Sequence, residues 1–574
     1  MVKERTDKRN KAATVVDKDK VQSKIDKLFK LDLKTKTGSV LTKYTYDSVK
    51  SLNHLLKSHL KKQNYTKLTK IQLKAYPTIN KGDDCVIKSQ TGSGKTLAYL
   101  VPLLNRLINV EPKIKRKDGL RCLIIVPTRE LGIQICNTLI KIGRACVNIV
   151  PGLLVGGENI KKEKEKIRKG LNIIVGTPGR VKYHLENTSN FIPDKLSSIV
   201  IEECDRMFDM GFEREMKFIF EKMRDEVENS QKILVSACIT NKVEGLLFKL
   251  DLDLEGDLKL IGFNDANMKE LDLPDTLSHL YITLDERNKI IYFIMLCKLF
   301  LQKKVVIFVA TADEANYLEA LLKNFNEYYD KVEDQKEPIF QTNINKIHGY
   351  MHQKDRSAVF GDFITQDRGF LICTDVGSRG LNFENISIII LFDVSVSYKD
   401  YINRVGRTAR IDKVGSAISL LNPCEDKYAQ KLKENCKITE IDKIELDRLF
   451  MDLTGEANNS HYHKINRVIN MFNMNEDNNY LARRAFNSFC RAYSMLKDKD
   501  CFNLKNMNLH AISKSFGLSD SNSRRRKVIS NYNEIKDSKN FLKPKLNDQE
   551  KKTDLMRKRI KQMMNQAENT SEFI

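Results

Sequence analysis

The sequence predicts an α/β protein with two tandem domains, each built on a parallel sheet, followed by a helical extension and flanked by basic tails. Short apolar, β-branched runs alternate with amphipathic segments over residues 41–265 and again over 281–425. Runs that are apolar on both faces and separated by helical patterns are typical of parallel sheets covered by helices. Beyond Pro423 these runs stop, and long helical patterns continue to about Phe516.

The expected strands form two sets in chain order. The first set is Asp84–Lys88, Leu123–Val126, Asn172–Val175, Ser198–Ile201 and Ile233–Ser236. The second set is Val305–Val309, Gly369–Cys373, Ser387–Phe392 and Ala417–Leu421. Residues 266–280 separate the sets and include Pro274, which predicts a linker there.

Both ends of the chain differ in composition from the domains. Residues 1–40 are rich in Lys and Asp, which predicts a basic disordered arm with a short helix near Val21–Phe29. The long helical patterns of residues 426–520 predict the helical extension. Residues 521–574 predict a second basic tail, which begins with a run of three arginines.

Charge and cysteine usage narrow the class of protein. The 98 Lys and Arg against 75 Asp and Glu give a formal net charge of +23. This excess favours a polyanionic partner, because basic side chains that neutralise phosphates release condensed counterions. The 12 cysteines show no spacing that suits zinc. No apolar run reaches the ~18–20 residues of a membrane helix, so we expect a soluble, intracellular protein with no membrane partner.

A glycine-rich segment after the first expected strand predicts a nucleotide site. Its glycines let backbone N–H groups point at phosphate oxygens, while Lys95 adds a positive charge and the Thr96 hydroxyl suits Mg²⁺. Ser89 stands where the usual phosphate loop has Gly. The segment consists of Ser89, Gln90, Thr91, Gly92, Ser93, Gly94, Lys95 and Thr96.

Carboxylates follow the expected strand Ser198–Ile201. Hydrolysis of a nucleoside triphosphate needs an acid that holds Mg²⁺ and a base that orients the attacking water. Glu202, Glu203 and Asp205 can supply these groups. The predicted Mg²⁺ ligands are therefore Thr96, Glu202 and Glu203, acting partly through water.

The order of motifs along residues 45–425 resembles the DEAD-box family of RNA helicases. The first-domain motifs are Thr69-Lys70-Ile71-Gln72, Pro127-Thr128-Arg129-Glu130-Leu131, Gly156-Gly157 and Thr177-Pro178-Gly179-Arg180. The resemblance implies two RecA-like domains, residues 41–265 for ATP binding and 281–425 as the helicase C-terminal domain, with ATP and Mg²⁺ as cofactors. It also implies that Gln72, beside Thr69, bonds the adenine edge and that Tyr46 stacks on the base.

The second domain carries further motifs of that family. His348-Gly349, the Thr374-Asp375 pair and the Arg404–Arg410 run resemble its elements. The resemblance implies an RNA-binding set of Pro127, Thr128, Arg129, Gly156, Gly157, Thr177, Pro178, Gly179, Arg180, Gln353, Arg356, Thr374 and Asp375. It implies a catalytic set of Lys95, Glu203, Arg407 and Arg410, in which the two arginines neutralise developing phosphoryl charge.

Four positions depart from the family pattern. They are Glu202, Cys238, Asn382 and Asn403. The resemblance implies that Ser236, Cys238, Asn382, Asn403 and Arg404 couple ATP binding to RNA binding. Two hypotheses follow. The chain is an RNA helicase with slow turnover, or it is an ATP-binding, hydrolysis-impaired RNA-binding scaffold. A DNA helicase is a weaker alternative.

The extension narrows the expected substrate. Phe486, Phe489 and Tyr493 fall on one helical face, which favours packing over base stacking, and His510 is expected to pack or cap rather than ligate. The segment resembles the C-terminal domain of nucleolar DEAD-box proteins that assemble the large ribosomal subunit. That resemblance implies pre-ribosomal RNA and pre-ribosomal proteins as partners, a nuclear and nucleolar location, and a monomer.

Overall fold

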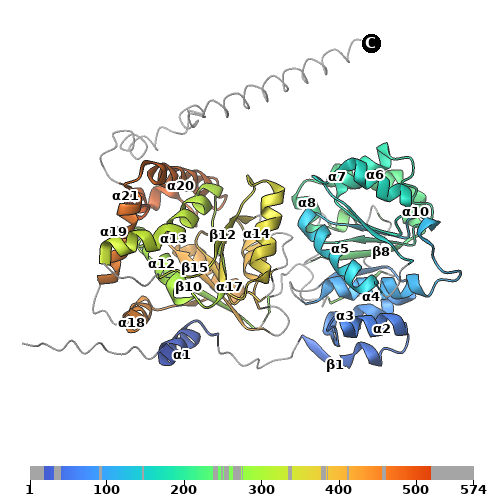
Figure 1. Cartoon of the computed structure of the whole chain (residues 1–574), viewed down its shortest axis with the longest axis horizontal. Helices are drawn as coiled ribbons and strands as arrows, with labels where there is room; N and C mark the ends of the chain where they lie inside the picture. The colour runs from blue at the N-terminus through green and yellow to red at the C-terminus, as the bar shows by residue number, and fades with distance from the viewer. Residues whose placement is uncertain are drawn as a thin grey trace, which may run out of the picture. The chain divides into compact units, whose positions relative to one another are not determined.

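The computed structural model describes most of the two domains and the extension (Figure 1). The described residues are 18–31, 40–88, 93–144, 148–236, 243–246, 250, 258–262, 273–274, 276–333, 339–375, 383, 385–409, 413–454 and 460–518. We call residues 40–262 the first lobe, 276–440 the second lobe and 443–518 the extension. The predicted basic tail 521–574 and the first part of the predicted arm lie outside the described residues.

The first lobe is built on a seven-stranded parallel sheet of order β5-β6-β4-β7-β8-β3-β9. Its strands are β3 (Cys85–Lys88), β4 (Cys122–Ile125), β5 (Pro151–Leu154), β6 (Ile173–Gly176), β7 (Ser198–Ile201), β8 (Gln231–Ser236) and β9 (Lys259–Ile261). A separate antiparallel pair joins β1 (Leu41–Thr45) to β2 (Lys67–Thr69).

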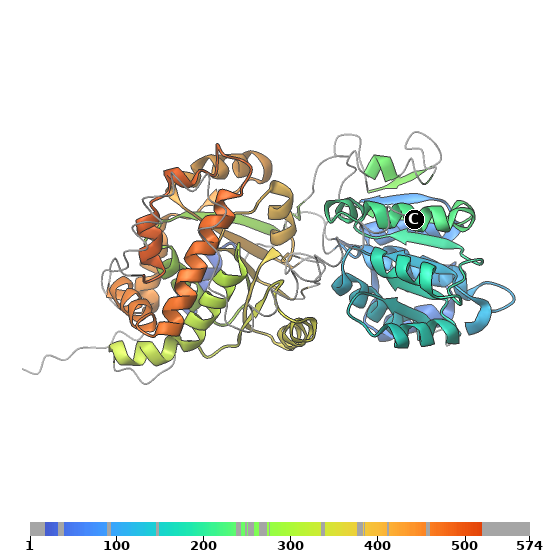
Figure 2. The ribbon, with the colours of Figure 1, turned by 90° about the horizontal axis from the view of Figure 1, so that it is seen from above.

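Helices cover both faces of this sheet (Figure 2). Because alternate residues of a strand point to opposite faces, Cys85 and Ile87 enter one core with Tyr99, whereas Val86 enters the other with Met207. The helices are α2 (His54–Lys62), α3 (Lys70–Lys81), α4 (Lys95–Ile108), α5 (Arg129–Gly143), α6 (Ile160–Lys169), α7 (Pro178–Asn187), α8 (Cys204–Asp209), α9 (Glu213–Lys222) and α10 (Arg224–Glu228).

The second lobe repeats this architecture with a parallel sheet of order β12-β13-β11-β14-β15-β10-β16. Its strands are β10 (Leu277–Thr283), β11 (Lys304–Phe308), β12 (Ile344–Ile347), β13 (Gly369–Cys373), β14 (Ile388–Leu391), β15 (Gly415–Leu421) and β16 (Thr439–Glu440). Its helices are α12 (Lys289–Leu299), α13 (Ala312–Glu333), α14 (Gln353–Thr365), α16 (Tyr398–Val405) and α17 (Asp426–Cys436).

The fold class and all nine predicted strands are confirmed, with ends displaced by at most a few residues. Two predicted boundaries are wrong. The linker 266–280 overlaps β10, a strand inside the second sheet, because its polar His279 and Ser278 hide the strand pattern. The extension does not begin at residue 426, since α17 and β16 still complete the second lobe.

The helix predicted near Val21–Phe29 exists as α1 (Lys18–Leu28) and packs against α18 (Lys443–Thr454) (Figure 1). Val21, Ile25 and Phe29 are buried, and the Phe29 ring meets Phe300 edge-on at a centroid distance of 4.8 Å. Helix α1 is therefore part of the second lobe's surface, although the first lobe follows it in sequence.

The extension consists of α18, α19 (Ser460–Phe472), α20 (Glu476–Ser494) and α21 (Leu509–Ser515), and α19 and α20 lie against α13. Phe486, Phe489 and Tyr493 are all buried, so the packing prediction for this aromatic face is confirmed. His510, which was expected to pack or cap, is exposed on α21, and exposure leaves the capping role as a prediction.

Within the described ranges, none of the helices combines the length and the apolar character needed to cross a membrane. The ten described cysteines are free thiols, and most of them are buried. Burial raises the pKa of the Cys122 thiol to about 12, which keeps it protonated and inert at neutral pH.

The buried Phe29 ring leads to a prediction about α1. Replacing it by Ala removes the largest apolar contact of this helix, and we expect α1 to open locally while the lobes stay folded. Hydrogen exchange followed by mass spectrometry should show loss of amide protection over residues 20–29 alone. Ser23→Ala, at an exposed position of the same helix, is the control. Unchanged protection in Phe29→Ala would contradict the packing described here.

Candidate functional site

The described part of the phosphate loop begins at Ser93, and Ser89, Gln90, Thr91 and Gly92 lie outside the described residues. Gly94 precedes α4 with φ +89°, so a side chain there would be strained. A Cβ atom at Gly94 would also stand 2.5 Å from Nε2 of Gln72. The loop therefore requires glycine both for its backbone conformation and for space.

Gln72 ties this loop to the helix before it. Its Oε1 accepts hydrogen bonds from the Thr69 N–H at 2.9 Å and from the Tyr46 hydroxyl at 3.0 Å. Its Nε2 donates to the carbonyl of Gly94 at 3.1 Å. Tyr46 is 3% exposed, and its hydroxyl orients Gln72. The stacking of its ring on a base stays a prediction.

Glu202 follows β7 at the carboxyl edge of the sheet and is buried. Its Oε2 has no hydrogen-bond partner among the described residues. Burial raises the pKa of Glu202 to about 8, while Lys95 lowers it and Glu203 raises it. The Tyr99 hydroxyl is near but does not reach hydrogen-bond geometry. An unsatisfied carboxylate oxygen within electrostatic reach of Lys95 fits a hard cation such as Mg²⁺.

No cluster of three or more His, Cys, Asp or Glu side chains that could bind a metal occurs in the described part of the chain. A cation at this site would therefore take its ligands from Glu202, Thr96, water and the phosphates of a nucleotide, which is how Mg²⁺ is usually held beside phosphates.

The two residues after Glu202 have defined surroundings. Glu203 adopts a left-handed conformation, φ 49°, and its Oε2 accepts from Arg206 at 2.8 Å. Asp205 is buried and accepts from the Ser236 hydroxyl at 3.1 Å. Lys399, from α16 of the second lobe, also lies 3.0 Å from Asp205. Ser236 therefore joins the end of β8 to the acidic motif, and its coupling role stays a prediction.

Arg404 is a buried structural link within the second lobe. Its Nε and Nη2 donate to both carboxylate oxygens of Asp375, at 2.6 and 3.0 Å. Its Nη1 donates to the carbonyls of Asp393 and Val394. Asp375 is thus engaged by Arg404 and also borders the groove described below, and its RNA-binding role stays a prediction.

Arg407 is 6% exposed and donates from Nε to the carbonyl of Asn403 at 3.0 Å. Burial lowers the pKa of Arg407 to about 10, and Glu203 opposes that shift. The guanidinium therefore stays charged at neutral pH. Arg410, Cys238 and Asn382 lie outside the described residues.

A groove of about 860 Å³ brings together residues of both lobes. Every predicted RNA-binding residue except Gly157 and Pro178 lines it, together with five residues that were not predicted. Its lining is Pro127, Thr128, Arg129, Glu130, Gly156, Thr177, Gly179, Arg180, Tyr183, Met210, Phe212, Ala310, Gln353, Arg356, Thr374 and Asp375. Glu130 accepts from Gln353 at 3.2 Å and from Arg356 at 2.8 Å, so these two residues are held in place across the groove.

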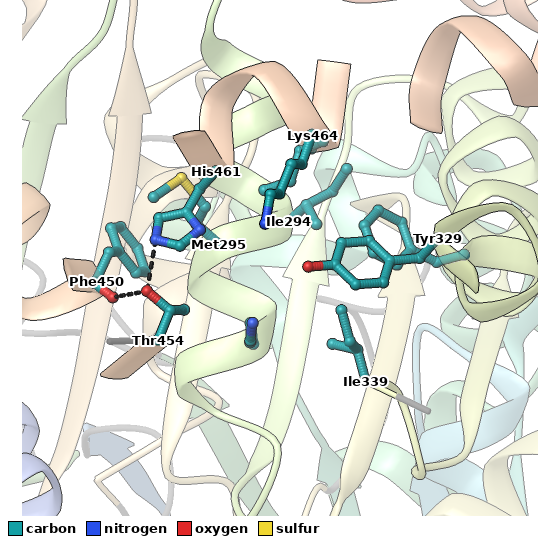
Figure 3. Close-up of a pocket in the computed structure, with 11 residues that line it drawn as sticks. Ile294, Met295, Tyr329, Ile339, Phe450, Thr454, His461 and Lys464 are labelled. Carbon is teal, nitrogen blue, oxygen red and sulfur yellow. Dashed lines mark hydrogen bonds between the residues drawn. The ribbon is translucent and has the colours of Figure 1, made fainter. Parts of the chain in front are cut away.

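A much smaller cavity lies in the second lobe between α12, α13, α18 and α19 (Figure 3). Its walls are mainly apolar, with Met295 and Phe450 near His461 and Tyr329 on the opposite side. At about 20 Å³ it has room for roughly one water molecule. It is a packing gap where the extension meets the lobe, far too small for a nucleotide.

Two residues important to this site were not singled out from the sequence. Lys399 contacts Asp205 and Asp209. No sequence pattern around Lys399 distinguishes it from an ordinary surface lysine. Glu163 is buried beneath the groove. A signal for it did exist, because Ile160, Glu163 and Ile167 share the spacing i, i+3, i+7, which puts a charge in the apolar stripe of a helix.

Family models match three parts of the chain. The DEAD/DEAH box helicase model matches residues 69–246, and the helicase conserved C-terminal domain model matches residues 288–412. A third model, described as "ATP-dependent rRNA helicase SPB4-like, C-terminal extension", matches residues 475–521.

Individual relatives agree with these models. "ATP-dependent RNA helicase HAS1" of Lodderomyces elongisporus is 32% identical over 80% of this chain and 76% of its own length. "ATP-dependent DNA helicase DDX31" of Homo sapiens is 30% identical over 79% of this chain, which spans 58% of that protein. Among solved structures, "DEAD-box helicase Mss116 bound to ssRNA and UDP-BeF" covers 86% of this chain and 96% of its own, at 22% identity and a TM-score of 0.68. That likeness supports the fold.

The pKa of Glu202 predicts how stability changes with pH when no nucleotide is bound. Its folded pKa of about 8 lies above the ordinary value of 4.5. The folded protein therefore keeps a proton that the unfolded chain releases, and the free energy of unfolding falls as the pH rises through this window. Glu202→Gln stays neutral, so we expect it to gain stability relative to the unsubstituted protein between about pH 5.5 and about pH 8.5.

Denaturant unfolding at the two pH values measures this difference. Glu213→Gln removes an exposed carboxylate of the same lobe and serves as the control. If the three proteins lost stability in parallel, the raised pKa of Glu202 would be ruled out.

Proposed function

Because the chain belongs to the DEAD-box family of ATP-dependent RNA helicases, we propose that it grips an RNA backbone across its two RecA-like lobes. It couples ATP hydrolysis to local RNA unwinding or to remodelling of RNA–protein particles. The observation that carries this proposal is the groove in which nearly all the predicted RNA-binding residues converge.

The first lobe supplies the nucleotide chemistry. The N-terminus of α4 and the Lys95 ammonium hold the phosphates, while Gln72 reads the adenine edge next to the loop it already supports. Thr96 and Glu202 would hold Mg²⁺, which would supply positive charge against the phosphates. Glu203 orients the attacking water with the carboxylate oxygen that Arg206 leaves available.

The second lobe supplies positive charge to the same reaction. Arg407 stays protonated although buried, and together with Arg410 it neutralises charge that develops on the transferred phosphoryl group. ATP and RNA both favour the arrangement in which the lobes cooperate, which is a shift of population toward the state they bind better. Ser236, beside Asp205, lies on the path between the two ligands.

The RNA side reads backbone rather than sequence. Gly156, Thr128, Thr177 and the groove arginines line the groove, and backbone amides, hydroxyls and guanidinium groups typically contact phosphates and riboses. The choice of RNA must come from elsewhere, and the extension and the basic tails are the parts available.

The extension supports a role in ribosome assembly. Its match to a model described for an rRNA helicase, together with the net charge of +23, favours pre-ribosomal RNA and pre-ribosomal proteins as partners. We therefore propose assembly of the large subunit and rRNA processing in the nucleolus, by a monomer. The likeness to the branch typified by DEAD-box protein seven of yeast stays a prediction.

Substitutions in the nucleotide site test the enzymatic proposal. Lys95→Ala should abolish RNA-stimulated ATP hydrolysis, since it removes the charge that holds the phosphates. Glu202→Asp shortens the carboxylate and should raise kcat by about threefold to tenfold, because Mg²⁺ tolerates little deviation from octahedral geometry. Phosphate release with and without single-stranded RNA measures both.

The hydrolysis-impaired scaffold makes a different prediction for the same assay. The unsubstituted protein would then bind ATP but release no phosphate above the Lys95→Ala background. Replacing the RNA by DNA of equal length and sequence separates RNA stimulation from the DNA alternative.

The proposed substrate has its own test. Ultraviolet crosslinking of the full chain in cells should recover pre-ribosomal RNA, with the reads concentrated in the large-subunit portion. Deleting residues 475–518 should disperse the reads over unrelated RNA while ATP hydrolysis persists. Recovery of mainly messenger RNA would refute the assignment to ribosome assembly.

A further inference from the structure

Helix α6 carries a buried carboxylate in an otherwise exposed, highly charged surface. Its sequence alternates lysines and glutamates, and Lys162, Glu165 and Lys166 are exposed. Glu163 is 2% exposed and shares the inner face with Ile167. A charge buried at this depth is costly unless it is paired and hydrogen-bonded, so its partners indicate why it is there.

The partners of Glu163 lie in the loop after β5 and in helix α7. Its Oε1 accepts from the backbone N–H of Val155 at 3.2 Å, immediately before the Gly156-Gly157 pair. Its Oε2 lies 3.0 Å from Nε2 of His184 and 3.4 Å from Nε of Arg180. One carboxylate therefore joins the loop after β5 to α7, which follows β6.

Arg180 closes the same loop from the other side. Its Nε donates to the carbonyl of Val155 at 3.3 Å, and its Nη2 donates to the carbonyl of Glu158 at 3.1 Å. These carbonyls stand on either side of the two glycines. The guanidinium thus bridges both ends of the loop, and Glu163 compensates its charge.

The enclosed loop is tightly restricted. Gly157 has φ +82°, and a Cβ atom there would lie within 2.4 Å of the Arg129 guanidinium. The loop is thus held between Arg129 and Arg180, and Gly156 is left facing the groove. A backbone amide can bind a phosphate oxygen well only if its direction is fixed before binding.

His184 extends the network away from the groove. It is fully buried, and its Nδ1 lies 2.9 Å from the Thr188 hydroxyl. An imidazole that carries its proton on Nε2 satisfies both contacts, because it donates to Glu163 and accepts from Thr188. His184 thereby fixes the orientation of the Glu163 carboxylate from the side that faces away from the groove.

We propose that Glu163 is a positioning residue for RNA binding, whose carboxylate fixes the Gly156-Gly157 loop and Arg180 in the arrangement that grips the RNA backbone. This inference rests on the proposed function, since it assumes that the groove binds RNA. Glu163 itself does not face the groove and touches neither RNA nor nucleotide.

The test is the affinity for RNA of the full-length Glu163→Gln protein. The amide keeps the size of the side chain but removes the charge opposite Arg180 and His184. Binding of a fluorescent single-stranded RNA, in the presence of a non-hydrolysable ATP analogue, should weaken by about tenfold, the order expected when a charge-assisted hydrogen bond is lost. The KM for RNA in the ATPase assay should rise in parallel, whereas kcat at saturating RNA and the KM for ATP should stay unchanged.

Two further variants separate positioning from general stability. Glu165→Gln makes the same change at an exposed position of α6 and should bind RNA normally. Thr188→Val breaks only the contact behind His184, and we expect a smaller loss of about twofold to threefold with the fold intact. The effects of Glu163→Gln and Arg180→Ala should not add in the double variant, because both act through one loop.

The inference is overturned if Glu163→Gln folds and binds RNA as tightly as the unsubstituted chain. If Glu163→Gln does not fold, the same result for Thr188→Val overturns it. A fall in kcat at unchanged RNA affinity would overturn it as well. RNA binding is measured without ATP hydrolysis, so the two proposals can fail separately. If the unsubstituted protein binds RNA but does not hydrolyse ATP, the proposed enzymatic function is refuted. The comparison of RNA affinities still tests the role of Glu163 in that case. An unsubstituted protein that binds no RNA would refute both.

Discussion

Parallel strand pairing is the constraint on which both proposed ligand sites depend. In the first sheet β4, β6, β7 and β8 run in one direction and in register, so that Ile125, Gly176 and Ile201 end at the same edge. The residues that follow these strands must then emerge side by side, whatever their separation in the chain. For this reason Glu202 and Ser236 lie at the same edge of the sheet as the loops that face the groove. A local shift of strand register would move the residues proposed to bind nucleotide away from those proposed to bind RNA.

Within that frame, three buried ionisable side chains have different surroundings. Arg404 has a bidentate carboxylate partner and two carbonyls, and Glu163 has an amide, an imidazole and a guanidinium. Glu202 has an oxygen with no hydrogen-bond partner in the described structure. The first two are satisfied by the fold alone. The unsatisfied oxygen of Glu202 costs free energy until a cation binds to it. A site that binds its cation together with a nucleotide needs such an unsatisfied oxygen.

The sequence predicted what depends on local pattern and missed what depends on distant partners. Interior strands such as β11 are continuous apolar runs, so their positions were found, whereas β12 and β16 lie at sheet edges and lack that signature. The motifs named residues that line one groove, and the binding of RNA there stays a prediction. They could not reveal that Tyr46 supports Gln72 or that Asp375 pairs with Arg404, because those contacts form only once separate elements are packed.

The position of α1 has a consequence for how the molecule is made. Lys24 pairs with Asp452, 428 positions later in the chain, and Phe29 needs Phe300. During synthesis at roughly 5–20 residues per second, α1 lacks its partner helix α18 for about twenty seconds or more. The first lobe can fold in the meantime, while the apolar face of α1 stays exposed until the extension emerges. Helix α1 thus leaves the ribosome before the first lobe but docks only after the first lobe has emerged.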